Sequence, residues 1–240
     1  GHAYGKLEGL PTQDPAFGLE ATWIAPSQKD YARTLGYTVV DASTALATHL
    51  NKVLRENAAD LVSQDETQQL LDKLAARFPK LVENLVPGKI QLSVLTRVLQ
   101  NLLSESVPIR DMRSIVETLS EESAKTQDPE ELTGLVRPRL GRMIVQNLVG
   151  VQEVLPVITL EPGLERMLQN AADQTGTGQT AVLEPDLAES LFKALRNGAA
   201  KTQEQHECAI LVVSPSVRPW LAKLLKHRVG DLMVLSYSEI

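Results

Sequence analysis

Four histidines are the residues best suited to acid–base or metal chemistry in this chain: His2, His49, His206 and His227. They fall in four different predicted elements. No two are three or four residues apart, which is the spacing that brings two imidazoles to one metal ion on a helix. The sequence therefore predicts no metal site, and a packed or capping role is the expectation for His49.

Cys208 is the only cysteine. A single thiol excludes an internal disulfide and a cysteine zinc cluster, and it suits a reducing compartment. The apolar run at 209–213 that follows predicts a strand. We therefore expect a buried, unreactive thiol at this position and not a nucleophile.

Patterns of glycine that accompany catalysis are also missing. The Gly-Thr-Gly segment at 176–178 lacks the third glycine and the lysine of phosphate-binding loops, and no Gly-x-Ser-x-Gly elbow occurs. We expect an exposed loop at 174–179, no cofactor and no enzymatic activity. A small enzyme is the alternative if Asp14, Thr48 and His49 converge around a bound ligand.

Charged clusters have structural interpretations. The acidic runs at 121–122 and 130–131 lie at predicted helix ends, where solvated charge is common. The spacing of Arg137, Arg139 and Arg142 places their guanidinium groups on the outer face of a helix, with an anionic partner as the alternative.

A second basic cluster begins another predicted helix. Arg110, Asp111 and Arg113 share its first turn. Structural ion pairing or a subunit contact is the expectation there.

The composition describes a globular chain of moderate size. Its 240 residues are 43% hydrophobic and 22% charged, which indicates neither disorder nor a fibrous repeat. A formal net charge of −6 argues against nucleic acid as a partner. No apolar run approaches the about 20 residues that span a bilayer, and no signal peptide is evident. We expect a cytosolic piece of a larger protein, without a small-molecule substrate.

The elements that must position these residues change in character along the chain. The first 22 residues are irregular and lead to a short strand at Trp23–Ile24. A short helix follows from Ser27 to Leu35, where Gly36 stops it. The β-branched run 37–40 then predicts another strand. Together these form a partial α/β subdomain.

A helical pattern begins at Ser43, with an apolar stripe that must be buried against another surface. A capping box at 63–66 starts the next helix, and Asp128 caps a later one, in which Pro138 predicts a kink or a split. Helices are expected at 43–62, from 63, at 79–86, at 92–103, at 108–119 and from 128. These predict an all-α central subdomain.

Strands and helices alternate after Gly150. Strands are predicted at 154–160, 210–214 and 232–235, with helix starts at 161–162 and 183–186 and a helix at 217–226. This order predicts a small C-terminal α/β subdomain with right-handed crossovers. The predicted fold is thus α+β and multidomain, divided into 1–62, 63–150 and 151–240.

Several segments read together are more specific than the composition. They are Asp-Pro-Ala-Phe-Gly-Leu at 14–19, Gly-Tyr-Thr-Val-Val-Asp at 36–41, Ala-Thr-His-Leu at 47–50, Leu-Val-Glu-Asn-Leu-Val-Pro at 81–87, Val-Leu-Gln-Asn-Leu-Leu at 98–103 and Val-Pro-Ile-Arg-Asp-Met-Arg at 107–113. In these segments the chain resembles the cytosolic part of the FlhA/LcrD family, the export-gate membrane proteins of bacterial type III secretion. The residues at 39–50 and 234–237 favour the flagellar branch over the virulence branch.

The resemblance implies the cytoplasmic domain of a bacterial inner-membrane protein. In the family this domain forms a ring of nine, receives export chaperones carrying their substrates, and contacts the stalk of the export ATPase. The function implied is a docking platform. The alternative is mainly a ring-forming structural element of a virulence-type secretion apparatus, in which Arg110 and Arg113 matter more.

The family's chaperone-docking site implies five residues here: Asp14, Phe17, Leu19, Val40 and Thr48. An apolar surface of Phe17, Leu19 and Val40 would seat an anchor of the partner, while Asp14 and Thr48 orient it. Alternatively, Phe17 and Val40 are ordinary core and Asp14 caps a turn. Pro138 departs from the family, whose helix runs through this position.

Overall fold

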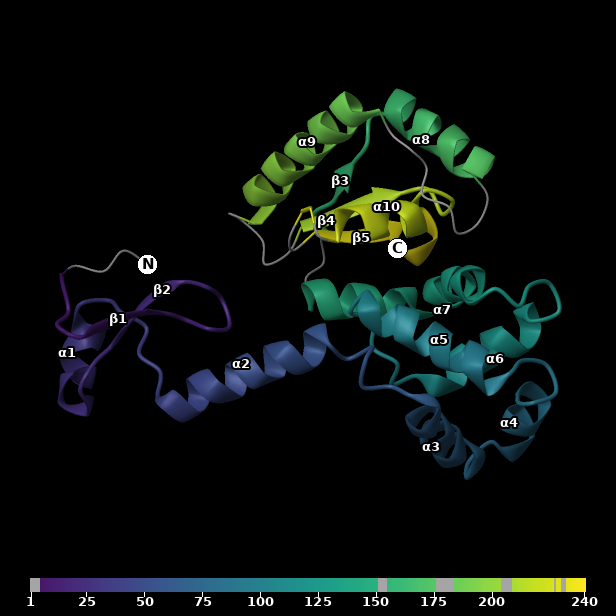
Figure 1. Ribbon diagram of the computed structural model, residues 1–240, viewed down its shortest axis with the longest axis horizontal. Helices are drawn as coiled ribbons and strands as arrows, with labels where there is room; N and C mark the ends of the chain where they lie inside the picture. The colour runs from purple at the N-terminus through teal and green to yellow at the C-terminus, as the bar shows by residue number, and fades with distance from the viewer. Residues whose placement is uncertain (1–4, 151–154, 176–183, 204–208, 227, 230–231) are drawn as a thin grey trace. The chain divides into compact units, whose positions relative to one another are not determined.

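The computed structural model describes residues 5–150, 155–175, 184–203, 209–226, 228–229 and 232–240 (Figure 1). Predictions about His2, His206, His227, Cys208 and residues 176–179 of the loop expected at 174–179 lie outside these residues. Residues 174–175, the first two of that expected loop, are helical instead and end α8 (Pro162–Thr175). The chain forms two compact units, Gly1–Ala58 and Ala59–Ile240. The predicted division at 62–63 and 150–151 stays a prediction. Among the described residues no helix is long and apolar enough to cross a membrane.

A β-hairpin opens the first unit. Strands β1 (Leu10–Gln13) and β2 (Glu20–Trp23) pair antiparallel, with Leu10 opposite Trp23 and Gln13 opposite Glu20. The strand predicted at Trp23–Ile24 is thus present but begins earlier. The loop at 14–19 joins the two strands, and it contains a glycine, Gly18, with a φ of +68°.

Two short helical segments follow the hairpin, η1 (Pro26–Gln28) and α1 (Lys29–Thr34). Gly36 has a φ of +87°, a conformation that glycine adopts without steric cost, and it ends α1 as predicted. The strand predicted at 37–40 is wrong, because the described residues there pair with no other strand. β-Branched residues favour extended backbone, but a strand also needs a partner.

Helix α2 (Ala42–Glu56) completes the first unit. Its N-cap is Asp41, whose carboxylate accepts hydrogen bonds from the Thr44 amide (2.7 Å) and the Ser43 hydroxyl (2.9 Å). These bonds lower the pKa of Asp41, and the bond from the Thr44 amide has the largest effect. The apolar stripe expected to be buried is exposed in this chain at Leu46, Leu50, Val53 and Leu54.

The second unit begins with a layer of helices. Its elements are α3 (Gln64–Ala75), α4 (Pro79–Leu85), α5 (Leu92–Ser104), α6 (Met112–Glu122) and α7 (Pro129–Val149). The capping box of Ser63 and Glu66 and the cap by Asp128 are confirmed. Helix α6 begins at Met112 and not at Pro108, because Asp111 provides its cap. Helix α7 continues through Pro138, so the predicted split is absent.

The rest of this unit alternates strands and helices, as predicted. Its elements are β3 (Ile158–Thr159), α8 (Pro162–Thr175), α9 (Pro185–Gln203), β4 (Ala209–Val213), α10 (Arg218–Leu225), β5 (Leu232–Ser236) and η2 (Tyr237–Glu239). The three strands are parallel in the order β3-β4-β5. β3 is shorter than the strand predicted at 154–160.

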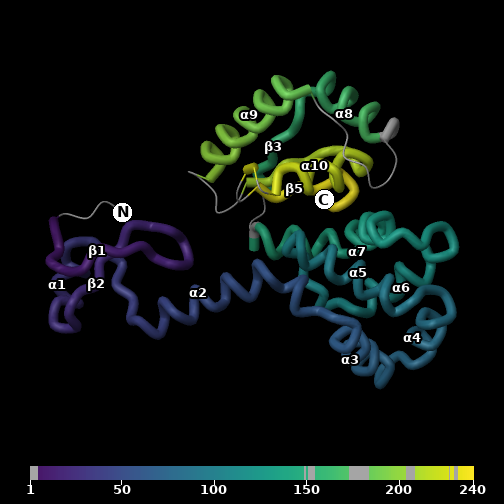
Figure 2. Tube along the Cα trace, viewed as in Figure 1, coloured from purple at the N-terminus to yellow at the C-terminus, as the bar shows by residue number. Residues whose placement is uncertain are grey.

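Both faces of this sheet are covered by helices. Ile210 and Val212 of β4 belong to the core of the helical layer, whereas Leu211 and Val213 belong to a second core with α8, α9 and α10. Figures 1 and 2 show the sheet between α7 on one side and α8 and α9 on the other. Burial on both faces is typical of parallel strands. One core therefore joins the helical layer to one face of the sheet, and a second core fills the other face.

Candidate functional site

Asp14 organises the hairpin loop that carries two of the predicted site residues. Its Oδ1 accepts hydrogen bonds from the backbone amides of Ala16 and Phe17, both at 2.8 Å. Its own backbone joins both sides of the loop, since its amide donates to the Leu19 carbonyl and its carbonyl accepts from the Gly18 amide. Asp14 thus caps the turn, as the structural interpretation predicted.

Phe17 and Leu19 are not core residues. Their side chains lie on this loop at 70% and 65% exposure, and Val40 is about half exposed. The alternative interpretation, which placed Phe17 and Val40 in an ordinary core, is therefore wrong for this chain. The loop whose turn Asp14 caps thus holds two large apolar side chains in solvent.

Helix α2 supports the loop through Lys52, a residue that the sequence analysis did not identify. The Lys52 ammonium group donates a 2.5 Å hydrogen bond to the carbonyl oxygen of Ala16, whose side chain is buried. Lys52 also lies 3.7 Å from Glu56. The available signal was its position one helical turn after Thr48, on the same face of α2.

Thr48 and Val40 are less directly connected to the loop. The Thr48 hydroxyl donates to the carbonyl oxygen of Thr44 within α2 at 2.8 Å. Among the described residues, neither Thr48 nor Val40 forms a hydrogen bond with the loop at 14–19. The structure therefore joins Asp14, Phe17 and Leu19 in one element and reaches α2 through Lys52.

His49 was the acid–base candidate of this region. Its Nδ1 is buried and has no hydrogen-bond partner among the described residues. No hydrogen bond within the described chain links His49 to Asp14 or Thr48. No group of three metal-ligating side chains occurs among the described residues either.

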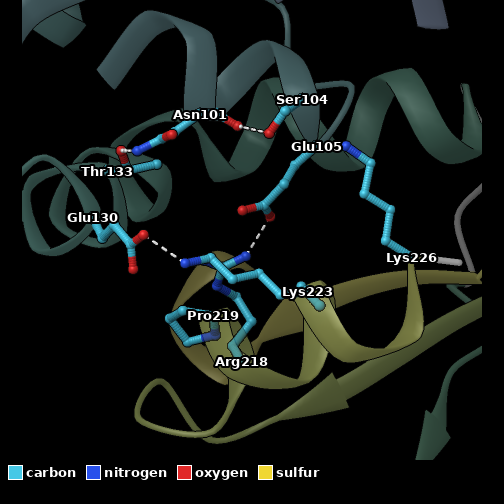
Figure 3. A pocket seen from close by; sticks show the side chains of 10 residues that line it. Asn101, Ser104, Glu105, Glu130, Thr133, Arg218, Pro219, Lys223 and Lys226 are labelled. Carbon is cyan, nitrogen blue, oxygen red and sulfur yellow. Dashed lines mark hydrogen bonds and ion pairs between the residues drawn. The ribbon is translucent and has the colours of Figure 1, made fainter. Parts of the chain in front are cut away.

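The second unit has a small pocket of about 110 Å³ between the helical layer and α10 (Figure 3). Glu105 and Arg218 form an ion pair in its wall, and Lys223 reaches Glu130 at 2.5 Å. The other lining residues are Asn101, Ser104, Thr133, Pro219, Ala222 and Lys226. Both carboxylates of the pocket thus already hold a cation, whereas the ammonium group of Lys226 has no ion pair among the described residues.

Arg137 contradicts the prediction that its guanidinium group lies on the outer face of a helix. Its side chain is 0% exposed and pairs with Glu105 and Glu239. Burial lowers the pKa of Arg137, but these two carboxylates raise it above its ordinary value. Arg139 and Arg142 are exposed, as expected.

Arg113 has the structural role expected for it. Its Nε donates to Glu117 at 2.7 Å, and its guanidinium group lies 4.7 Å from the centre of the Phe78 ring. Arg110 is exposed.

Comparison with known proteins covers both units. The FHIPEP family matches residues 1–240. Flagellar biosynthesis protein FlhA of Proteus mirabilis is 45% identical over 240 residues, which are 100% of this chain and 34% of that protein. FlhA of Bacillus subtilis is 37% identical over 234 residues, or 98% of this chain and 35% of that protein.

Solved structures share the fold. A chain in the structure of the Chlamydia pneumoniae CdsV and CdsO protein complex matches with a TM-score of 0.82 at 26% identity, covering 92% of this chain and 64% of that one. Nonameric EPEC SctV-C, determined by cryo-EM, matches with a TM-score of 0.78 at 25% identity, covering 100% of this chain and 72% of that one.

This chain spans about a third of the length of the curated relatives it matches, 34% in the first case. The match nevertheless runs through both compact units and includes every segment from which the resemblance was drawn. The mostly helical fold with small sheets agrees with the solved relatives. The chain belongs to the FHIPEP family.

Proposed function

We propose that this chain is a cytoplasmic docking part of a bacterial inner-membrane protein that serves as a flagellar type III export gate. Relatives that bear the name flagellar biosynthesis protein support the flagellar branch. The proposed partners are export chaperones carrying their substrates. The contacts would be reversible and involve no covalent chemistry, cofactor or small-molecule substrate, so we propose that the chain is not an enzyme.

The observation that carries the proposal is the exposure of Phe17 and Leu19 on a loop whose backbone is fixed by Asp14. An apolar anchor that is already ordered loses little conformational entropy when a partner covers it. Large apolar side chains in such positions commonly supply most of the binding free energy of an interface. Val40 and Thr48 would extend this surface toward α2.

The test is a calorimetric titration of the chain with a flagellar export chaperone bound to its substrate. Binding in the micromolar range, on the order of −8 kcal/mol, is expected for the parent and should be lost in Phe17→Ala. Met167→Ala, which shortens an exposed apolar side chain of α8, is the matched control and should bind normally. Equal binding by Phe17→Ala and the parent would place the docking site elsewhere.

A contact with the stalk of the export ATPase is a second part of the proposal. The solved complex of the related CdsV with CdsO shows that a relative binds another protein. Adding the purified stalk protein to the same calorimetric experiment tests this contact. If the stalk and the chaperone use separate surfaces, Phe17→Ala should weaken only chaperone binding.

The second candidate function is ring formation, which the nonameric state of SctV-C favours. Under this hypothesis the chain acts mainly as a structural element, and exposed charges such as Arg110 contact a neighbouring copy. Arg110→Glu in the full-length protein should then reduce ring assembly, measured by electron microscopy, while chaperone binding persists. Arg139→Glu is the control because Arg139 is another exposed arginine, on α7.

A further inference from the structure

Four charged side chains meet where the helical layer contacts the α/β layer. They are Glu105 at the end of α5, Arg137 in α7, Arg218 at the start of α10 and Glu239 in η2. We call them the charged quartet. Two come from each layer, and their formal charges sum to zero.

Arg137 and Glu239 form the centre of the quartet. Nε of Arg137 donates to Oε1 of Glu239 at 3.1 Å, and Nη2 donates to Oε2 at 2.8 Å. This two-point contact fixes the plane of the guanidinium group against the carboxylate. Both side chains are almost fully buried, at 0% and 1% exposure. Ser236 adds a hydrogen bond from its hydroxyl to Oε1 at 3.0 Å.

Glu105 closes the quartet on its other side. Its Oε2 accepts from Nη1 of Arg137 at 2.9 Å and also from Nη1 of Arg218. Nε of Arg218 lies 3.6 Å from Oε1 of Glu239. Each arginine therefore faces both carboxylates, and each carboxylate faces both arginines. Glu105 is the most accessible member, at 23% exposure, and lines the pocket in Figure 3.

Backbone packing brings the two layers close enough for these bonds. A Cβ atom on Gly141, one helical turn after Arg137 in α7, would lie 2.4 Å from the Glu239 carbonyl oxygen. Such a contact is shorter than van der Waals packing permits, so glycine is required at this crossing. The sequence therefore supplies both the room for η2 against α7 and the charges that hold it there.

Apolar packing alone would allow the two layers some freedom to slide. Contacts such as those of Ile210, Val212 and Leu235 with the helical core are non-directional. Buried charges behave differently, because any displacement that separates one pair leaves its members unpaired in a medium that solvates them poorly. The quartet can hence be satisfied in only one relative placement of the layers.

We propose that the charged quartet is a latch that holds the α/β layer in a single orientation on the helical layer, so that the two layers move as one block. Loss of the Glu239 charge opens it and permits a second orientation. This role is separate from the docking proposed at Phe17, which lies in the other unit.

Pulsed electron paramagnetic resonance on the 240-residue chain tests the latch. Spin labels are placed at Asp72→Cys in α3 and Glu189→Cys in α9, both exposed positions, with Cys208→Ser to prevent labelling of the native thiol. The parent should give one narrow distance distribution. Glu239→Gln, which keeps the side-chain shape, should add a second, displaced population.

Glu121→Gln is the matched control, since it removes the carboxylate charge from an exposed ion pair with another arginine of α7, Arg139. It should leave the distribution narrow. A single unshifted distance in Glu239→Gln would overturn the proposal.

A second variant covers the case in which Glu239→Gln fails to fold. Arg137→Met combined with Glu239→Leu removes one cation and one anion together and leaves Arg218 paired with Glu105. This double variant should fold cooperatively yet still show the displaced population. A narrow distribution at the parent's distance would show that apolar packing alone sets the orientation, and the latch would be rejected.

Discussion

The ammonium group of Lys52 and the carbonyl oxygen of Ala16 are joined by a 2.5 Å hydrogen bond across 36 residues of sequence. The bond connects α2 to the hairpin loop immediately before Phe17. It is the direct hydrogen-bonded link between the apolar tip of the loop and the helix that carries Thr48. Phe17 is therefore exposed to solvent while the backbone of its loop is held against α2.

The first prediction concerns this link. Lys52→Met keeps the aliphatic stem but removes the donor, so the loop should become more mobile and chaperone binding should weaken by a few fold, about 1 kcal/mol after allowance for solvent. Calorimetry measures the affinity for the chaperone, and hydrogen exchange at the amides of Ala16 and Phe17 measures the mobility of the loop. Lys52→Arg retains a donor and should lose less chaperone affinity than Lys52→Met. An unchanged rate of hydrogen exchange in Lys52→Met would contradict the role assigned to the bond.

The second prediction separates two roles of Asp14. If the carboxylate acts by accepting the amides of Ala16 and Phe17, Asp14→Asn should retain most chaperone binding, because the amide oxygen of asparagine accepts the same bonds. Asp14→Ala should lose binding while the second unit keeps its melting temperature. Equal loss in both variants would mean that the partner needs the negative charge itself.

The third prediction is a pH dependence at the start of α3. Hydrogen bonds from the Ser63 hydroxyl and then from the Ser63 amide lower the pKa of Glu66 below its ordinary value of 4.5. A carboxyl group whose pKa is lowered on folding stabilises the folded state at pH values above its ordinary pKa. This contribution disappears as the pH falls through the folded-state pKa. Stability to urea should thus decrease below about pH 4.5 in the parent, and Glu66→Gln should show a shallower decrease. Identical pH profiles would contradict the capping role.

The fourth prediction compares a buried ion pair with an exposed one. Glu239→Gln should destabilise the chain by about 3 kcal/mol, because it leaves Arg137 buried without its full counter-charge. Glu121→Gln should change stability by less than about 0.5 kcal/mol, since its pair with Arg139 is solvated. Urea unfolding followed by circular dichroism measures both. Similar losses in the two variants would show that burial of the quartet adds nothing.

The fifth prediction uses two glycines of the same helix. Gly134→Ala places its Cβ in open space and should stabilise α7 by about 0.5–1 kcal/mol. Gly141→Ala introduces the clash with the Glu239 carbonyl and should destabilise the chain despite the same gain in helix propensity. Thermal melting of the two variants measures the difference. A stabilised Gly141→Ala would mean that η2 is not held closely against α7.

Local signals in the sequence predicted most of the helical elements. The capping box of Ser63 and Glu66 and the cap at Asp128 involve residues within one turn of each other, so the chemistry of a short segment decides them. The strand predicted at 37–40 failed for the opposite reason. Its formation depended on a partner strand that no local pattern specifies.

The same distinction between local signals and distant partners applies to the candidate site. The turn formed by Asp14 follows from residue types within the loop, and its hydrogen bonds span at most three residues between side chain and amide. Lys52 and Arg137 were missed or misplaced because their partners lie 36 and 102 residues away. A charged side chain on a helix gives no sequence signal that its counter-charge will come from the far end of the chain.

Alternate residues of strand β4 pack in different cores on the two faces of the sheet. Ile210 touches the helical core and Leu211 touches the core of α8, α9 and α10, although they are adjacent in sequence. Substitutions at neighbouring positions should therefore be compensated in different places. Among natural variants of this family, changes in the size of residue 210 should co-vary with residues of α5 and α7, and changes at residue 211 with those of α8 and α9.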